Sequence, residues 1–312
     1  MKILMIGNQE SGKTTYMASA YGMLESGVEG FHIRTDEDTS RLYGKLFRAI
    51  KSGSYPLASD KRKLHSFDLY HNTKNVLHFD WIDYNGGIVN TLDADELMND
   101  IDTSDGLMLF FEAKALLEQK NSVHRMRRIL SLISQKLATV EAPLFTVIIV
   151  ITKVDQLGTA DEYEQAIIPL RRFIENTKGN NKIYARIIPV SCTSKGLYNT
   201  ELPLLDMLDS GLRLARQTAA NSAVEHNEKA KSWYAQRGIF DWVFSRLQGL
   251  PTNVEMAESQ WQKAKEQVEL YKTLEKPMNK LGDYVSSYEV LLPVGINHSN
   301  ERSKKASRIV RF

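Results

Sequence analysis

The stretch GNQESGKT, residues 7–14, follows the apolar run ILMI, residues 3–6, almost at the start of the chain. It satisfies the pattern GxxxxGK[ST] and stands between an expected strand and an expected helix. Glycines at 7 and 12 let the backbone turn so that successive N–H groups point inward, and the helix adds its positive N-terminal end. Such donors select a polyphosphate, so the sequence predicts a site for a nucleoside di- or triphosphate. A plain strand-to-helix turn is the alternative.

The loop and the start of the helix are expected to hold both the phosphates and a metal ion. Lys13 would reach the β- and γ-phosphates, where it would also stabilise charge on a transferred phosphoryl group. The hydroxyl of Thr14 would ligate Mg²⁺, which bridges the same oxygens. The predicted nucleotide-binding residues here are Asn8, Gln9, Glu10, Ser11, Gly12, Lys13, Thr14 and Thr15.

A second motif, TKVD at residues 152–155, ends the apolar run at 147–151 and predicts which base is bound. The carboxylate of Asp155 accepts two hydrogen bonds at once from the N1–H and the exocyclic amine of guanine, a donor pair that adenine lacks. Asp155 therefore favours guanine, with Thr152 and Lys153 in the same site. An aspartate that simply caps a helix after a strand is the alternative.

The motif SCT, residues 191–193, follows the last expected strand. Ser191 could brace the TKVD loop, the backbone N–H of Cys192 could meet the guanine oxygen, and Thr193 completes the predicted contacts. The thiol of Cys192 is expected to be a small buried group and not a reactive one.

A fourth motif, DYNG at residues 83–86, lies between the first two motifs in the sequence and follows the expected strand at 76–82. Asp83 at the strand end would hold Mg²⁺ through water, and the N–H of Gly86 would meet the γ-phosphate if its peptide swings. Asp80 could also be the aspartate of this motif, but only Asp83 is followed by a glycine three residues later. The pattern DxxG is weak by itself.

With these motifs in order, residues 1–218 resemble the P-loop GTPases of the translation-factor and Ras-like class. The segment before the second strand, its SYP turn and the ending IDYNGG also resemble bacterial GTPase-domain proteins of multi-gene conflict or signalling systems. The resemblance implies that a hydroxyl in the mobile loop ligates Mg²⁺ when the γ-phosphate is present. Ser59 is the candidate, and Thr35 and Thr39 are the alternatives.

One departure from the family bears on catalysis. Many members place a glutamine after the DxxG glycine to orient the attacking water, and Gly87 stands there in this chain. We therefore expect slow intrinsic hydrolysis, or a residue supplied from elsewhere, such as Arg62 or an arginine of a partner. Gln9 and Glu10 add bulk and charge near the γ-phosphate.

Apolar runs alternate with amphipathic stretches, which predicts an α/β, three-layer P-loop GTPase domain with a mostly parallel six-stranded sheet. Residues 1–218 form this domain, residues 27–64 a long switch-loop insertion, residues 219–296 a helical appendage broken at Gly249–Pro251 and Pro277, and residues 297–312 a flexible basic tail. The expected strands are 2–6, 65–71, 76–82, 106–112, 144–151 and 183–190, and the expected helices are 13–26, 40–51, 93–101, 115–139, 161–176 and 201–218.

Composition narrows the class of protein further. The chain has 312 residues, a net charge of +2 and one cysteine, so we expect no nucleic-acid partner and no internal disulfide, and the cytoplasm as its location. No apolar run is long enough for a membrane span, and any membrane contact would be peripheral. The expected partners are GTP or GDP with Mg²⁺, and a protein partner or a second copy, through the appendage or the switch loops.

These observations favour a GTP-driven molecular switch that hydrolyses GTP slowly or with help from a partner. A nucleotide-gated scaffold that holds GTP or GDP with negligible turnover is the second hypothesis. An ATP-using P-loop enzyme is the third, and it depends on Asp155 having no part in base selection.

Overall fold

The structure is a computed structural model that divides the chain into two compact units. One contains residues 1–211 and the described residues after 281, and the other contains residues 212–281. The described residues are 1–56, 62–83, 94–118, 144–177, 182–238 and 251–294, with 127, 130, 131, 133–135 and 245; side chains are described from 97 onward in the third range. Within these residues, no helix is both long and apolar enough to cross a membrane.

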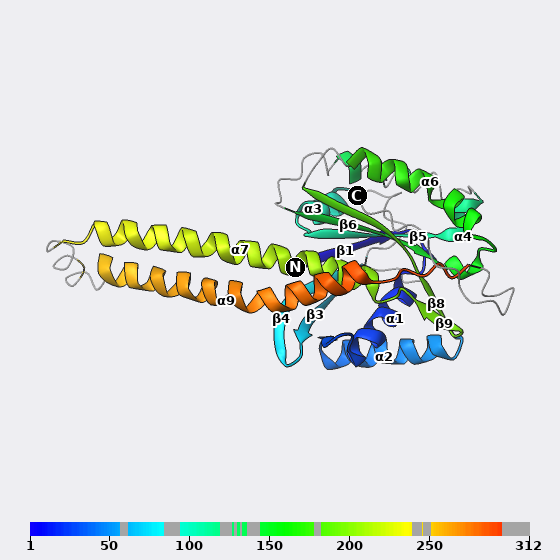
Figure 1. The fold of residues 1–312 in the computed structure, drawn as a ribbon, viewed down its shortest axis with the longest axis horizontal. Coiled ribbons are helices and arrows are strands. Elements are labelled where there is room, and N and C mark those ends of the chain that lie inside the picture. The colour runs from blue at the N-terminus through cyan, green and yellow to red at the C-terminus, as the bar shows by residue number, and fades with distance from the viewer. Residues whose placement is uncertain are drawn as a thin grey trace. The chain divides into compact units, whose positions relative to one another are not determined.

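The first unit is built on a seven-stranded sheet (Figure 1). Neighbouring strands are parallel from β4 to β7 and antiparallel from β2 to β4, in the order β2-β3-β4-β1-β5-β6-β7. The strands are β1 (Lys2–Gly7), β2 (Phe31–Arg34), β3 (Lys63–His71), β4 (Lys74–Asp83), β5 (Gly106–Glu112), β6 (Phe145–Thr152) and β7 (Ile183–Pro189). The predicted α/β class is confirmed, and all six predicted strands are present.

The seventh strand, β2, corrects the prediction of six strands. It lies in the segment 27–64, for which a switch-loop insertion with a helix at 40–51 was predicted. Phe31 and Ile33 point into the core, and the four-residue strand pairs with the end of β3. Four residues are too short for an alternating pattern to stand out, so its stability comes from the neighbouring long strand. The same segment also contains α2 (Glu37–Lys51), whose N-cap Asp36 accepts a hydrogen bond from the N–H of Thr39 at 2.9 Å.

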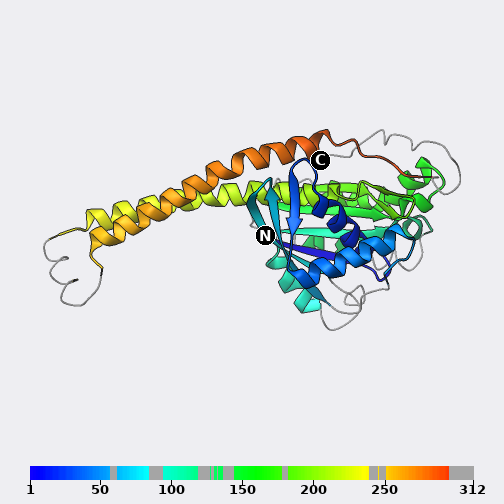
Figure 2. The same cartoon turned by 90° about the horizontal axis from the view of Figure 1, so that it is seen from below.

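Helices cover both faces of the sheet. α1 (Lys13–Ser26) and α2 lie on one face, and α3 (Ala94–Asp102), α4 (Ala113–Leu117) and α6 (Ala160–Thr177) lie on the other (Figure 1). Figure 2 shows α2 beside α1. Of the predicted helix at 115–139, most residues lie outside the described part of the chain. A small hairpin of β8 (Ser191–Thr193) and β9 (Gly196–Tyr198) follows the sheet.

Alternating side chains of the parallel strands divide the core into two layers. Leu109 of β5 and Ile149 of β6 belong to the layer under α3, α4 and α6. On the opposite side the ring of Tyr16, in α1, packs against Phe110 at 5.2 Å and Trp81 at 6.2 Å between ring centroids. The P-loop helix is therefore anchored to the sheet by a fully buried aromatic cluster.

The second unit is a helical hairpin made from α7 (Leu202–Ala235) and α9 (Asn253–Ser287), each of which begins or ends in the first unit. The Arg216 guanidinium lies 4.0 Å from the ring centroid of Tyr271, and His226 hydrogen-bonds Gln260 at 2.7 Å. α9 continues through Pro277, so the predicted break there is wrong. Residues 282–294 belong to the first unit, whereas the appendage was expected to extend over 219–296.

We expect Ile33→Ala to lower the free energy of unfolding by about 2–4 kcal/mol, because it leaves a cavity under β2. Arg34→Ala is the matched control, since Arg34 is exposed and its guanidinium only lies over the Tyr70 ring at 4.7 Å. The control should cost less than about 1 kcal/mol. Urea denaturation measures both, and equal effects would contradict the assignment of β2 to the sheet.

Candidate functional site

The loop at residues 7–14 has the backbone geometry of a phosphate cradle. Gly12 lies in the left-handed region with φ of 86°, and α1 begins at the next residue. Gly7 approaches β5 so closely that a Cβ atom would lie 2.7 Å from the Phe110 carbonyl oxygen. The loop therefore needs its two glycines for different reasons, one for conformation and the other for space. The first N–H groups of α1, which have no acceptor within the helix, face the same loop.

Lys13 is folded back over the loop. Its ammonium group donates to the carbonyl oxygens of Gly7 at 2.8 Å and Asn8 at 3.3 Å. Only 8% of the residue is exposed, and burial lowers the pKa of the amine, whereas the charge of Asp83 opposes this shift. The structure thus places a buried cation at the mouth of the loop, held by backbone carbonyls that a phosphate could replace as its partner.

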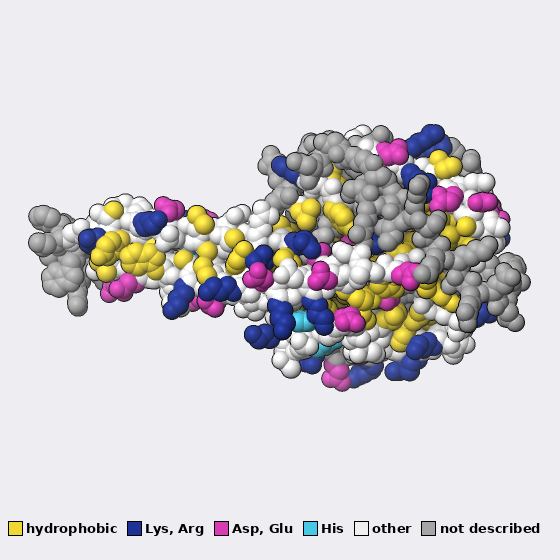
Figure 3. Space-filling view, viewed as in Figure 1, with side chains coloured by type: hydrophobic (Ala, Val, Ile, Leu, Met, Phe, Trp, Pro, Cys, Tyr) yellow, Lys and Arg dark blue, Asp and Glu magenta, His cyan; other side chains and the backbone are white. Residues whose placement is uncertain are grey.

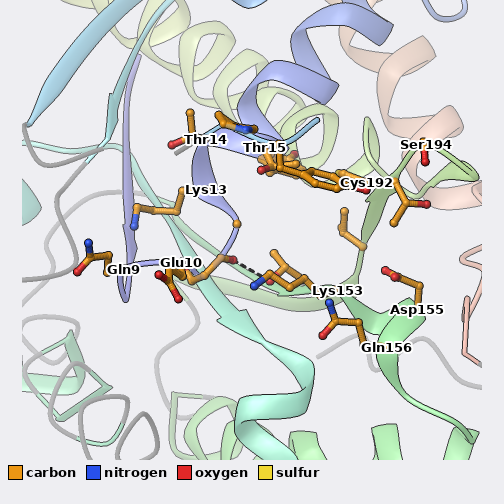
Figure 4. A pocket seen from close by; sticks show the side chains of 18 of the residues that line it. Gln9, Glu10, Lys13, Thr14, Thr15, Lys153, Asp155, Gln156, Cys192 and Ser194 are labelled. Atoms are coloured by element: carbon orange, nitrogen blue, oxygen red, sulfur yellow. Dashed lines mark hydrogen bonds between the residues drawn. The ribbon is translucent and has the colours of Figure 1, made fainter. Parts of the chain in front are cut away.

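A cavity of about 540 Å³ opens beside the loop (Figure 4). Lys13, Thr14 and Thr15 lie toward one end of it, and Asp155, Cys192 and Ser194 lie toward the other. The predicted residues that line it are Gln9, Glu10, Ser11, Gly12, Lys13, Thr14, Thr15, Asp83, Thr152, Lys153, Asp155, Cys192 and Thr193. Asn8 and Ser191 stand just behind this lining, in contact with Lys13 and Asp155.

Seven further residues line the cavity that the sequence did not single out as ligands. They are Tyr16, Tyr55, Pro56, Gln156, Val190, Ser194 and Lys195. Tyr55 and Pro56 belong to the SYP turn, so the long connection did contain a signal for them. Lys195 follows the SCT motif by two residues and brings a second cation to the Asp155 end. Tyr16 carries no such signal, because an aromatic residue in a helix is usually a core residue.

The Asp155 end of the cavity is held by side-chain contacts. Asp155 lies in a short 3₁₀ helix, Val154–Gln156, after Lys153 in the left-handed conformation with φ of 55°. The hydroxyl of Ser191 donates to Asp155 Oδ1 at 2.5 Å, which is the bracing contact expected of Ser191. The next α-helix begins only at Ala160, so this geometry speaks against a helix-capping role for Asp155.

Thr152 connects the two ends of the site. Its hydroxyl lies 2.7 Å from the carbonyl oxygen of Ser11 in the P-loop and 3.3 Å from that of Phe111. Lys153 in turn forms an ion pair with Glu112 at 3.1 Å. Thr152 thus acts on the site by holding the P-loop against the end of β6. The thiol of Cys192, which lies 3.6 Å from the hydroxyl of Thr200, has its pKa raised to about 11 by burial.

Asp83 provides an observation that tests whether the residues present fit a metal ion. The residue is 5% exposed, and its Oδ1 atom has no hydrogen-bond partner in the described part of the chain. Burial raises the pKa of this carboxyl to about 6, although Lys13 and Lys63 oppose the shift. A hard cation would satisfy the buried oxygen, and Thr14 lines the same cavity, so the donor set fits Mg²⁺. Asp80, the alternative aspartate of the motif, instead accepts a hydrogen bond from the Ser66 hydroxyl at 2.6 Å.

The predicted switch residues are only partly within the described chain. Ser59, Gly86 and Gly87 lie outside the described residues, and their roles stay predictions. Thr35 donates to the Ser66 carbonyl oxygen at 2.7 Å and Thr39 lies in the first turn of α2, and neither lines the cavity. Arg62 is held in an ion pair with Asp100 of α3 at 3.0 Å.

A contact that sequence analysis missed fastens the residues after α9 to the Asp155 end of the site. Asn199 is 2% exposed and left-handed, with φ of 54°. Its Nδ2 donates to the carbonyl oxygens of Pro189 and Leu291, each at 2.7 Å, and its Oδ1 accepts from the Leu291 N–H at 3.0 Å. Asn199 thereby joins the end of β7, two residues before Ser191, to Leu291, which lies 92 residues after Asn199 in the sequence.

Comparisons with known proteins give only distant likenesses, and the fold class rests on the strand order and helix layers described above. The fold is the predicted P-loop α/β fold. No family model and no curated protein matches the chain. Three solved structures resemble it: Sup35 complexed with GDP, at 16% identity and a TM-score of 0.33; the S. cerevisiae Ski7 GTPase-like domain bound to GTP, at 17% and 0.39; and the mammalian SRP receptor, at 13% and 0.36.

These matches cover 61%, 65% and 65% of this chain and 36%, 43% and 97% of the respective other chains. The chain therefore spans less than half the length of the first two. Likeness at this distance carries no argument about function, which has to come from the residues of the site. The resemblance to bacterial conflict or signalling systems stays a prediction.

We expect Asp83→Asn to raise the free energy of unfolding at neutral pH by about 1–2 kcal/mol, because it removes a buried charge. The wild-type pKa rises on folding from 3.8 to about 6, so this cost is absent below the lower value and complete above the upper one. The gain from the variant should therefore appear as the pH rises through this interval. Asp80→Asn is the control, and it should not stabilise. A destabilised Asp83→Asn protein in thermal denaturation would contradict the argument.

Asn199→Ala should lower the free energy of unfolding by about 2–3 kcal/mol, because it leaves buried backbone groups of Pro189 and Leu291 unsatisfied. Hydrogen exchange should also become faster for the amides at 190–193 than for those of β1. Asn75→Ala, at an exposed position of β4, is the matched control. Unchanged exchange at 190–193 would show that the contact does not hold this loop.

Proposed function

We propose that the chain binds GTP and GDP with Mg²⁺ and hydrolyses GTP to GDP and phosphate as a molecular switch. The observation that carries the proposal is a single cavity with Lys13 and the P-loop amides at one end and Asp155, braced by Ser191, at the other. A purine nucleotide has the same two ends, a polyanion and a base.

At the phosphate end, the chain supplies donors that are already in position. The amides of residues 9–15 and the Lys13 ammonium would bind the β- and γ-phosphates, and Lys13 would exchange its carbonyl partners for phosphate oxygens. Thr14 and Asp83 would hold Mg²⁺, directly and through water respectively. Bound Mg²⁺ supplies charge neutralisation at the bridging phosphate oxygens. Its arrival would also offset the cost of the buried carboxylate.

At the base end, recognition would depend on hydrogen-bond polarity. The Asp155 carboxylate would accept from N1–H and the exocyclic amine of guanine, and the backbone N–H of Cys192 would donate to the guanine oxygen. The Ser191 hydroxyl orients Asp155, so Ser191 is a positioning residue here. An adenine would leave the buried carboxylate facing an acceptor, which costs more than a missing contact.

For hydrolysis, a water would attack the γ-phosphorus in line, and Lys13 would stabilise the charge on the transferred group. The N–H of Gly86 would add a donor to the same oxygens. No side chain at Gly87 can orient the water, and Arg62 is engaged with Asp100. These features support slow turnover that a partner could accelerate. Loss of the γ-phosphate would release the segments around Ser59 and Gly86, which couples nucleotide state to a partner protein.

The same observations support a second candidate. If Gly87 and the Arg62–Asp100 ion pair leave the attacking water without a positioning group, the chain would be a nucleotide-gated scaffold with negligible turnover. In that case nucleotide binding would be kept and the chemical step lost. The two functions differ in one rate and share one binding site.

Titration with fluorescent GDP, GTP and ATP in the presence of Mg²⁺ tests the binding proposal. We expect both guanine nucleotides to bind and ATP to bind at least about 100-fold more weakly. Lys13→Ala should weaken all binding, whereas Asp155→Asn should remove the preference for guanine. Asp161→Asn, at an exposed position of α6, is the control that should change neither. Equal competition by ATP would overturn the proposal.

Single-turnover cleavage of GTP by the purified protein then separates the switch from the scaffold. A rate above the uncatalysed rate that is lost in Lys13→Ala supports the switch. A rate equal to that in solution, with tight binding preserved, supports the scaffold instead.

A further inference from the structure

Residues 219–268 of the second unit bury small apolar side chains and leave larger ones exposed. Among the described residues of 219–268, the buried apolar side chains are four alanines, Ala219, Ala230, Ala257 and Ala264. Larger apolar side chains of the same stretch are exposed, and Figure 3 shows hydrophobic groups gathered along this hairpin. They are Val224, Tyr234, Val254, Trp261 and Val268, with fractional exposures between 36% and 63%. A hairpin that buries alanine and exposes tryptophan gains little from its own interior.

Three of these exposed side chains follow one line along α9. Val254, Trp261 and Val268 are spaced seven residues apart, so each lies two helical turns from the next on the same side of the helix. The Trp261 ring also contacts the Tyr234 ring of α7, with 5.4 Å between centroids. We name Tyr234, Val254, Trp261 and Val268 the apolar stripe. Leu270 comes nine residues after Trp261 and lies on the opposite side of α9, outside the stripe.

Apolar residues that recur every seven positions are typical of a seam between paired helices. Ala257 and Ala264 of α9 are buried, and Trp261 between them contacts Tyr234 of α7, so the stripe borders the seam between α7 and α9 and offers its exposed side to another helix. Contiguous exposed apolar surface on a water-facing helix marks an interaction surface more often than an isolated apolar residue does. The stripe therefore needs an occupant, and the charges beside it indicate which one.

Two opposite charges flank the stripe, one on each side of Trp261 along α9. Glu258 precedes Trp261 by three residues, and Lys265 follows it by four. Neither side chain forms an ion pair within the described part of the chain. If α9 pairs antiparallel with α9 of a second copy about a twofold axis near Trp261, each Glu258 lies beside Lys265 of the second copy. Val254 then faces Val268 of the second copy, and the two Trp261 rings meet near the axis.

A parallel pairing in register would bring like charges together, Glu258 with Glu258 and Lys265 with Lys265, which is destabilising. Of these two arrangements, only the antiparallel one places opposite charges beside each other. We propose that the apolar stripe is a self-association surface, through which two copies of the chain pair their α9 helices antiparallel into a four-helix assembly. This proposal is independent of nucleotide binding and of the proposed function.

Sedimentation equilibrium of the full chain, from about 1 to about 100 µM, tests the surface. The wild type should be a dimer at the upper concentrations, and Trp261→Glu should be a monomer throughout. Trp261 is 38% exposed and contacts Tyr234 within the hairpin, so circular dichroism and thermal denaturation check that the variant keeps the fold, and the charge reversals below test the surface without removing this contact. Leu270→Glu is the matched control, with a similar exposed side chain on the opposite side of the helix, and it should remain a dimer.

Charge reversal tests the antiparallel arrangement. Glu258→Lys and Lys265→Glu should each raise the dimer dissociation constant at least about tenfold, because each breaks two symmetry-related pairs. The double variant E258K/K265E restores opposite charges across the axis, so its dissociation constant should return to within about threefold of the wild type.

Three results would overturn the proposal. One is a wild-type protein that stays monomeric throughout the concentration range, even if it binds a different protein. Another is a Leu270→Glu variant that dissociates as readily as Trp261→Glu. The last is a double charge reversal that remains as weak as the single reversals, which would exclude the antiparallel pairing.

Discussion

The parallel pairing of β1 with β4 and β5 is the constraint on which the site depends. It places Met5 opposite Asp83 and Gly7 opposite Phe110, so the ends of these strands reach the same edge of the sheet. β6 and β7 continue the parallel arrangement and bring Thr152 and Ser191 to that edge. The hydrogen bond from the Thr152 hydroxyl to the Ser11 carbonyl then closes the distance between motifs that are 141 residues apart. Because these strands run in the same direction, residues that are far apart in the sequence line one cavity.

The site carries an energetic cost in the absence of ligand. Asp83 and Lys13 are both buried, and burial disfavours the charged form of each. Their mutual attraction offsets part of this cost, and the carboxylate oxygen Oδ1 remains without a partner in the described structure. Stability is thus sacrificed where a cation and a polyanion would supply the missing contacts. A site built in this way becomes more stable when it is filled.

Much of the fold could be predicted because its signals are local and long. Short stretches of sequence are enough to recognise the apolar runs of β1, β5 and β6 and the glycine-framed P-loop. β2 could not be found that way, since four residues do not establish a period and pairing with β3 decides its conformation. The helix through Pro277 was missed for a related reason. A proline removes one backbone hydrogen bond, and the packing of a 35-residue helix outweighs that loss.

Sequence motifs identified residues that line the cavity, but not most of the contacts that hold those residues in place. Lys13, Asp83 and Asp155 line one cavity, and each stands in a motif of restricted residue type and spacing, whereas their roles in binding stay predictions. Asn199 has no such pattern, since its partners Pro189 and Leu291 are joined only in the folded chain. Thr152 stands in a motif, and yet its hydroxyl contacts the P-loop backbone, a use that spacing alone does not reveal.

The return of the chain after α9 makes the second unit an insertion with both ends rooted in the first. Leu292 is a member of the main core cluster, and Leu291 is clasped by Asn199. A cut anywhere within residues 236–252 would therefore leave two pieces that each contribute to one common core. A chain that stopped before residue 282 would lack Leu291 and Leu292 and would therefore lose part of the interior of the first unit.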